Sequence, residues 1–206
     1  MVEAGRQYDA GHLSFLELIR VVSEVAGAPF AAGALVKTGM GIARKAEVME
    51  FADFDAFLAS VEASANSVAH FEGAARYYQN GVFGLPACPF ASSVKTYQGF
   101  MGELPSEYAA VTENLNRPSP TAAKLRVGHG ASVSPFCGVH QSIRSALAER
   151  ISVGGKPLIV HQLGCKSGAG QRSVAEDFVA EVGVSVELVN AVLDENMCCY
   201  CARVAS

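Results

Sequence analysis

The sequence lacks tryptophan, and only 17% of its 206 residues are charged, whereas 50% are hydrophobic. This composition excludes a disordered chain, because disordered segments combine low hydrophobicity with high net charge. The 16 basic residues form no run and no stripe interleaved with aromatic residues, and the net charge is −4. We therefore expect no nucleic-acid partner and no membrane partner.

Long apolar runs are missing as well. No stretch reaches the roughly 18 uninterrupted apolar residues of a membrane-spanning helix. The segment from Met1 to Arg6 lacks a basic stretch leading into an apolar core, which a secretory leader would have. We therefore expect a cytoplasmic protein. In that reducing compartment its six cysteines are metal ligands, catalytic thiols or buried apolar residues rather than structural disulfides.

The order of the predicted elements indicates the α+β class and a single domain over residues 1–206, with 1–117 and 118–206 as candidate subregions. The N-terminal part is predicted to be helical, with a first helix from Asp9 or Ser14 and others over 30–48 and 51–67. Asn80 and Gly81, flanked by apolar residues, predict a β-hairpin near 70–86. A further helix is expected over 106–115.

The C-terminal part is predicted to be an α/β unit with a closing antiparallel hairpin. Its expected elements are a helix opened by Cys137 and running to about Ile151, a strand over 157–163, a helix over 173–182, and strands over 184–193 and 197–204. In the N-terminal half, Gly33, Gly39 and Gly41 give one predicted helix a thin face. This face indicates a helix–helix contact or a homodimer interface.

The cysteines are the main functional signal. Three of them, Cys88, Cys137 and Cys165, stand where a helix is expected to begin, and a helix N-terminus lowers a thiol pKa and stabilises an anionic thiolate. Cys137 and His140 are three residues apart, which places both on one helix face, with Arg144 one turn further along. This pair is either a metal-ligand pair, a thiolate with its imidazole base, or a half-buried cysteine beside a surface histidine.

A glycine-rich segment follows the predicted strand 157–163. Backbone N–H groups in such a loop bind anions, and Lys166 and Arg172 add positive charge. The segment departs from the nucleotide-binding Walker pattern, because Gly170 is followed by Gln171. The expected anion-binding or cofactor-binding residues are Lys166, Ser167, Gly168, Gly170 and Arg172.

Three more cysteines, Cys198, Cys199 and Cys201, lie near the C-terminus. The alternation of a strand predicts Cys199 and Cys201 on one face and Cys198 on the other. The candidate metal ligands are therefore Cys88, Cys137, His140, Cys165, Cys198, Cys199 and Cys201. They would hold an iron–sulfur cluster or, in a site that also draws on His161, a zinc ion.

Three functions are compatible with these patterns. The preferred one is a metal or iron–sulfur centre with a redox, catalytic or sensory role. The second is a metal-free thiol enzyme in which Cys137 or Cys165 is the nucleophile and His140 the base, acting on a small molecule with a carboxylate or phosphate. The third is a module that binds a small molecule or anionic ligand and whose cysteines are buried structural residues.

Overall fold

The computed structural model describes residues 2–67, 76–86, 105–117, 131–166 and 172–205. The helices in these ranges are α1 (Val2–Ala26), α2 (Ala28–Ala43), α3 (Phe54–Ser67), α5 (Ser106–Asn116), α7 (Pro135–Ala148), α8 (Glu176–Glu181) and α9 (Val186–Asp194). The strands are β1 (Met49–Phe51), β2 (Arg76–Tyr77), β3 (Val82–Pro86), β4 (Ile151–Val153), β5 (Lys156–Lys166), β6 (Arg172–Val174) and β7 (Met197–Val204). The predicted α+β class is confirmed.

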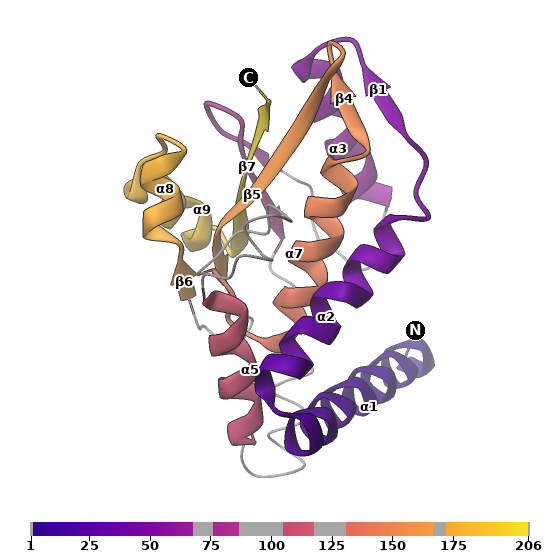
Figure 1. Cartoon of the computed structure of the whole chain (residues 1–206). Coiled ribbons are helices and arrows are strands. Elements are labelled where there is room, and N and C mark those ends of the chain that lie inside the picture. Colours follow the sequence, from indigo (N-terminus) through magenta and orange to yellow (C-terminus); the bar gives the residue numbers. More distant parts are fainter. Residues whose placement is uncertain (1, 68–75, 87–104, 118–130, 167–171, 206) are drawn as a thin grey trace.

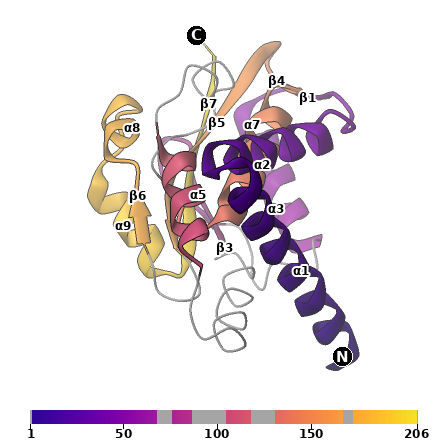
Figure 2. The ribbon, with the colours of Figure 1, turned by 60° about the horizontal axis from the view of Figure 1, so that its bottom comes forward.

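The strands form one mixed sheet with the order β1-β4-β5-β7-β3-β2, and β6 pairs with β5 beside this path. The long central strands β5 and β7 are antiparallel, and β7 is also antiparallel to β3. Helix α7 covers one face of this centre, while α8 and α9 cover the other, as the two views of the ribbon agree (Figures 1 and 2). The centre of the sheet is therefore buried on both sides.

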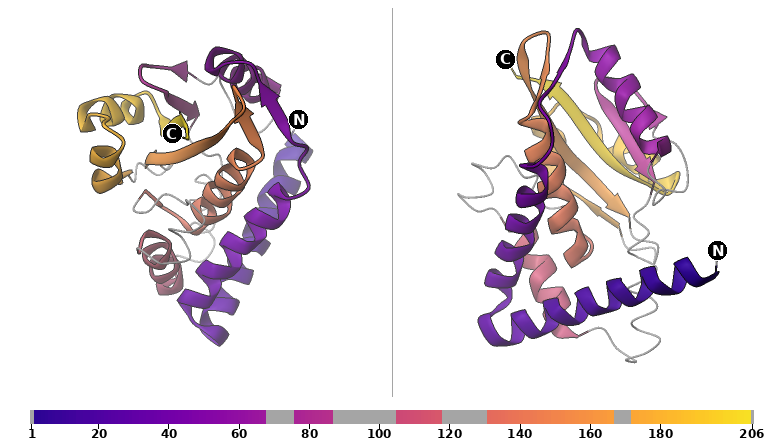
Figure 3. Two further views of the ribbon diagram at one scale, coloured as in Figure 1. Left: turned by 45° about the horizontal axis from the view of Figure 1, so that its top comes forward. Right: turned by 90° about the vertical axis from the view of Figure 1, so that its right-hand side faces the viewer.

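A second helical layer lies outside α7. Helices α1, α2 and α5 pack around a core that includes Leu16, Leu35, Val111 and Phe136. Figure 3 shows α2 running alongside α7, with α1 crossing below it. None of the described helices combines the length and apolar character needed to cross a membrane. Helix α7 is thus enclosed between the sheet and this outer layer.

Local signals set several element boundaries, and the predicted turn at Asn80 and Gly81 is one of them. Gly27, with φ of 88°, and Pro29 separate α1 from α2. Asn80 and Gly81 have φ of 55° and 76°, which is the backbone that a tight hairpin turn needs, and they join β2 to β3. The predicted strand 197–204 is confirmed as β7.

Other predictions are wrong in the C-terminal part. Residues 184–193, predicted as a strand, form α9, which begins after Ser185 as its N-cap. The apolar residues of α9 face the sheet, so its hydrophobicity is that of a packed helix. The helix predicted over 173–182 begins only at Glu176, because the residues before it form β6 on the edge of β5. The short strands β1 and β4 have no counterpart in the sequence prediction.

The glycine-rich face of α2 packs closely against another helix of the same chain at one glycine, Gly39. Gly39 is buried against α7, and a Cβ atom added there would collide with Ser142 Oγ and the Val139 carbonyl oxygen. Gly33 and Gly41 have open space in place of a Cβ atom. The predicted helix–helix contact therefore depends on Gly39, and the dimer interface stays a prediction.

We predict that Gly39→Ala destabilises the protein by about 1–3 kcal/mol, because the added methyl group forces α2 away from α7. Gly33→Ala on the same helix is the matched control, and it should raise stability by about 0.5–1 kcal/mol through the lower entropy of the unfolded chain. Urea-induced unfolding measures both variants. A Gly39→Ala variant as stable as the wild type would contradict the close packing of α2 on α7.

Candidate functional site

A β-bulge in β5 determines which cysteines can meet. The pairing of β5 with β7 runs from His161 opposite Cys201 to Gln162 opposite Tyr200, and then shifts so that Gly164 lies opposite Cys199. The extra residue is Leu163, and it reverses the alternation of faces along the strand. Without this shift, Cys165 would share the α9 face with His161. With it, the continued register places Cys165 opposite Cys198, on the face covered by α7.

Three thiols from three different elements therefore come together. Cys137 is in the first turn of α7, Cys165 in β5 and Cys198 in β7. The Sγ atoms of Cys137 and Cys165 are 3.7 Å apart, and those of Cys165 and Cys198 are 3.3 Å apart. All three side chains are buried and none is in a disulfide. The structure thus brings three of the candidate cysteines together.

The pKa values of the three thiols shift in different directions. A hydrogen bond from Cys165 has the largest effect on Cys137 and lowers its pKa to about 6, and the backbone at Val133 and Ser134 acts in the same direction against burial. A hydrogen bond from Cys165 also lowers the pKa of Cys198. Those two bonds, followed by burial, raise the pKa of Cys165. The contacts within the cluster therefore lower the pKa of Cys137 and Cys198 and raise that of Cys165.

Cys199 and Cys201 lie on the opposite face of the sheet, as the strand alternation predicted. They pack into the core beneath α8 and α9, and burial raises the pKa of Cys199 to about 12. His161 is on that face too, with its ring 5.3 Å from the ring of Phe178. A single site containing Cys137 cannot include these three residues, since the sheet separates them. Cys88 lies outside the described residues.

The predicted anion loop has a different setting. Lys166 ends β5 and Arg172 begins β6, and the two residues pair across an antiparallel ladder, so the loop joins two strands instead of leading into a helix. Arg172 donates hydrogen bonds to the carboxylate of Asp194, at 2.9 Å, and to the Asn190 carbonyl oxygen, at 3.1 Å. These contacts tie Arg172 to α9. Ser167, Gly168 and Gly170 lie outside the described residues.

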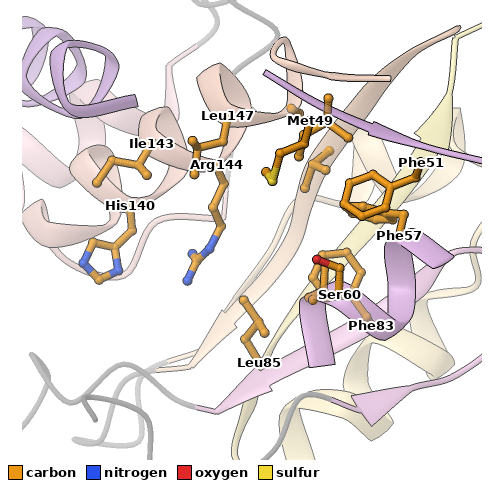
Figure 4. Close-up of a pocket in the computed structure, with 14 residues that line it drawn as sticks. Met49, Phe51, Phe57, Ser60, Phe83, Leu85, His140, Ile143, Arg144 and Leu147 are labelled. Carbon is orange, nitrogen blue, oxygen red and sulfur yellow. The ribbon is translucent and has the colours of Figure 1, made fainter. Parts of the chain in front are cut away.

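A cavity of about 460 Å³ opens on the same side of the sheet as the thiol cluster. Helix α7 forms one wall, and α3, β1, β3 and β5 form the others (Figure 4). Its lining is mostly carbon, from residues such as Phe57, Phe83, Leu85, Ile143 and Val160. Leu85 is the strand partner of Cys198. The cavity and the thiol cluster are therefore neighbours along β3 and β7.

His140 and Arg144 supply the cationic or ionisable groups of the cavity (Figure 4). His140 lines the cavity while Cys137, three residues earlier, is buried against Cys165. The pairing of Cys137 with His140 as nucleophile and base stays a prediction. Arg144 lies over the ring of Tyr200, with Cζ 4.5 Å from the ring centroid, and donates a hydrogen bond to Tyr200 Oη. Its charge also lowers the pKa of Cys198.

A smaller space lies behind Arg144, between α7 and β5. It shares Arg144 and Val160 with the cavity, and Gln141, Gln162 and Tyr200 line it as well. Gln141 Nε2 and Gln162 Oε1 are buried and have no hydrogen-bond partner within the described part of the chain. Polar atoms of this kind are rare in folded proteins and call for an explanation. Arg144 thus lies between the apolar cavity and this smaller space with its two glutamines.

The sequence analysis predicts neither the cavity nor the smaller space behind Arg144. A usable signal is present in α7, where Gln141, Ser142 and Ser145 are polar residues on a buried helix face. Polar side chains at such positions are unfavourable for packing alone. Gln162 gives the same signal on β5, since it is a buried polar residue in a largely apolar strand.

We predict that Cys165→Ala raises the pKa of Cys137, because it removes the hydrogen bond that has the largest lowering effect. At pH 7 the wild type should hold a thiolate that the variant largely lacks, measured as thiolate absorbance in a pH titration. Cys199→Ala, on the other face of the sheet, is the control and should leave the titration unchanged. Identical curves for the wild type and Cys165→Ala would show that Cys165 does not set the acidity of the cluster.

Comparison with known proteins assigns no family. No protein-family model matches the chain, and no curated protein or solved structure is significantly similar to it. Within the described residues, no group of three or more His, Cys, Asp or Glu side chains has the arrangement of a metal site. The function must therefore be inferred from the cavity and the thiol cluster themselves.

Proposed function

We propose that this protein binds a small molecule that has an apolar body and an anionic group, in the cavity between α7 and the sheet. The observation that carries this proposal is a cavity of about 460 Å³ with mostly apolar walls and the guanidinium of Arg144 within it. Small-molecule sites in proteins have volumes of roughly 300–1,000 Å³, apolar linings and a few polar groups that fix orientation. The cavity has each of these properties.

The apolar walls would supply most of the affinity. Side chains from α3, β3, β5 and α7 surround the cavity, so a ligand would be covered from several sides. Removing apolar surface from water contributes about 25 cal/mol per Å². A hydrocarbon chain or ring system would gain more from this lining than a sugar or a nucleotide, whose hydroxyl and phosphate groups would lose their hydrogen bonds to water.

The polar end would select the ligand's head group. The described residues that line the cavity include Arg144 and no aspartate or glutamate, so the local charge favours an anion. Arg144 is held over Tyr200, which limits the entropy lost when it binds a ligand. A carboxylate would accept hydrogen bonds from the guanidinium in a bidentate geometry.

We predict that decanoate binds and raises the thermal unfolding midpoint, whereas decanol binds more weakly. Arg144→Gln should weaken decanoate binding by roughly 10- to 100-fold, the value of a hydrogen bond to a charged group, and should leave decanol binding nearly unchanged. Isothermal titration calorimetry gives both affinities. Equal loss of decanoate and decanol binding would contradict a role of Arg144 in recognising the anion.

A variant that fills the cavity provides the structural control. Ser60 lines the cavity on α3, so Ser60→Phe should abolish binding of both probes. The adjacent residue Ala59 is exposed, and Ala59→Phe adds the same bulk outside the cavity. Retained affinity in Ser60→Phe, or equal losses in both variants, would show that the probes bind elsewhere.

We also retain, as a second proposal, a metal or iron–sulfur centre at the thiol cluster. It is supported by the approach of Cys137, Cys165 and Cys198 to within 3.7 Å and 3.3 Å in successive pairs. Four thiolates hold the common iron–sulfur clusters, and three or four hold zinc, so the three described cysteines would form part of such a site. The arrangement of the described side chains does not by itself form a metal site.

Metal content tests this second proposal. Protein purified without oxygen should contain iron with visible absorbance, or colourless zinc, in a stoichiometric amount by elemental analysis. Cys137→Ser should lose the metal, because it removes a ligand, whereas Cys199→Ser on the other face should retain it. Wild-type protein without metal, or Cys137→Ser protein with its full metal content, would exclude this centre.

A further inference from the structure

Cys165 and Cys198 lie close together on adjacent antiparallel strands. Gly164 of β5 is opposite Cys199 of β7, and each cysteine of the pair is the next residue along its strand from that registered pair. Residues opposed across antiparallel strands have Cα atoms about 4.5–5.5 Å apart, and disulfides span Cα separations of about 4.4–6.8 Å. The Sγ atoms of Cys165 and Cys198 are 3.3 Å apart, so the two sulfur atoms are already in contact.

The two thiols belong to one buried cluster on the α7 face of the sheet. A disulfide forms when the thiolate of one cysteine reacts with an oxidant and the thiol of its neighbour then attacks the oxidised sulfur. The Sγ–Sγ distance of 3.3 Å places the two sulfur atoms in contact for that second step. Cys199 and Cys201 lie on the other face of the sheet, in the core beneath α8 and α9.

We propose that Cys165 and Cys198 are a redox pair that hydrogen peroxide converts into a reversible disulfide. In the first step the Cys198 thiolate attacks one peroxide oxygen, the O–O bond breaks, and a sulfenic acid and hydroxide form. In the second step Cys165 attacks the sulfenic sulfur, the new S–S bond forms, and the sulfenic oxygen leaves as water with the proton of Cys165. The two sulfur atoms lose two electrons in total, and one peroxide is reduced to one molecule of water and one hydroxide, which takes a proton from the solvent.

This proposal does not depend on which ligand the cavity binds. It also requires a different protonation state of the cysteines than metal binding does. A metal site needs all its ligands as thiolates at once, whereas the redox pair needs one thiolate and one thiol. Cys137, 3.7 Å from Cys165, is not part of the bond in this proposal. Its loss should therefore leave the disulfide intact, and this separates the pair from a three-cysteine metal centre.

Peptide mapping tests the pair in the double variant Cys199→Ser/Cys201→Ser, which leaves Cys198 as the one cysteine in the tryptic peptide of residues 173–203. Chelator-treated, folded protein is exposed to hydrogen peroxide, the excess is removed with catalase, and free thiols are alkylated after denaturation. We expect a cross-linked species that joins residues 151–166 to residues 173–203, with the mass of the two peptides less two hydrogen atoms. Dithiothreitol should restore both alkylated peptides.

Further variants in the same background make the outcome decisive. Cys165→Ser and Cys198→Ser should each abolish the cross-link, and Cys137→Ser should retain it. Circular dichroism of each variant shows whether the fold is kept, and the result with the parent double variant does not depend on the others. An unchanged number of free thiols after peroxide treatment, or a cross-link that involves Cys88 or Cys137, would overturn the proposal.

Discussion

The β-bulge at Leu163 is the constraint on which the candidate chemistry of this protein depends. A regular strand would place His161, Leu163 and Cys165 on one face, against α8 and α9. The register shift between Gln162 and Gly164 moves Cys165 to the face covered by α7. Gly164 lies at the bulge, where the Cβ atom of any other residue would collide with Val189 and Leu193. Cys165 thereby contacts both Cys137 and Cys198. One extra residue converts separate buried cysteines into a cluster.

Helix α7 connects this cluster to the rest of the molecule. Its first turn supplies Cys137, and one to two turns later His140 and Arg144 line the cavity. Its far side is fixed by Gly39 of α2, where the two backbones approach too closely for any side chain. The position of α7 along its axis therefore sets the thiol contacts and the cavity walls together. Such shared support is typical of sites built on rigid elements.

The sequence could predict what local chemistry determines. The Asn80-Gly81 turn and the alternation in β7 each depend on a few neighbouring residues, and each appears in the structure as expected. The sequence predicts a strand where α9 lies, because apolar content alone does not distinguish a strand from a packed helix. The bulge in β5 and the pairing of Cys165 with Cys198 depend on contacts between distant segments. They left no periodic trace in the sequence, so the convergence of the thiols could be expected but not located.

Arg144 is the residue that the cavity and the cluster have in common. Its guanidinium lines the cavity, lies over the ring of Tyr200 and lowers the pKa of Cys198. Tyr200 in turn is two residues from Cys198, on the same face of β7, and its ring stacks on Phe83 of the cavity wall with a centroid distance of 5.4 Å. The guanidinium of this half-buried arginine is close to both sites, and charge–charge interactions strengthen as water is excluded from around them. The two candidate sites are thus parts of one electrostatic environment, organised around a single positive charge on α7.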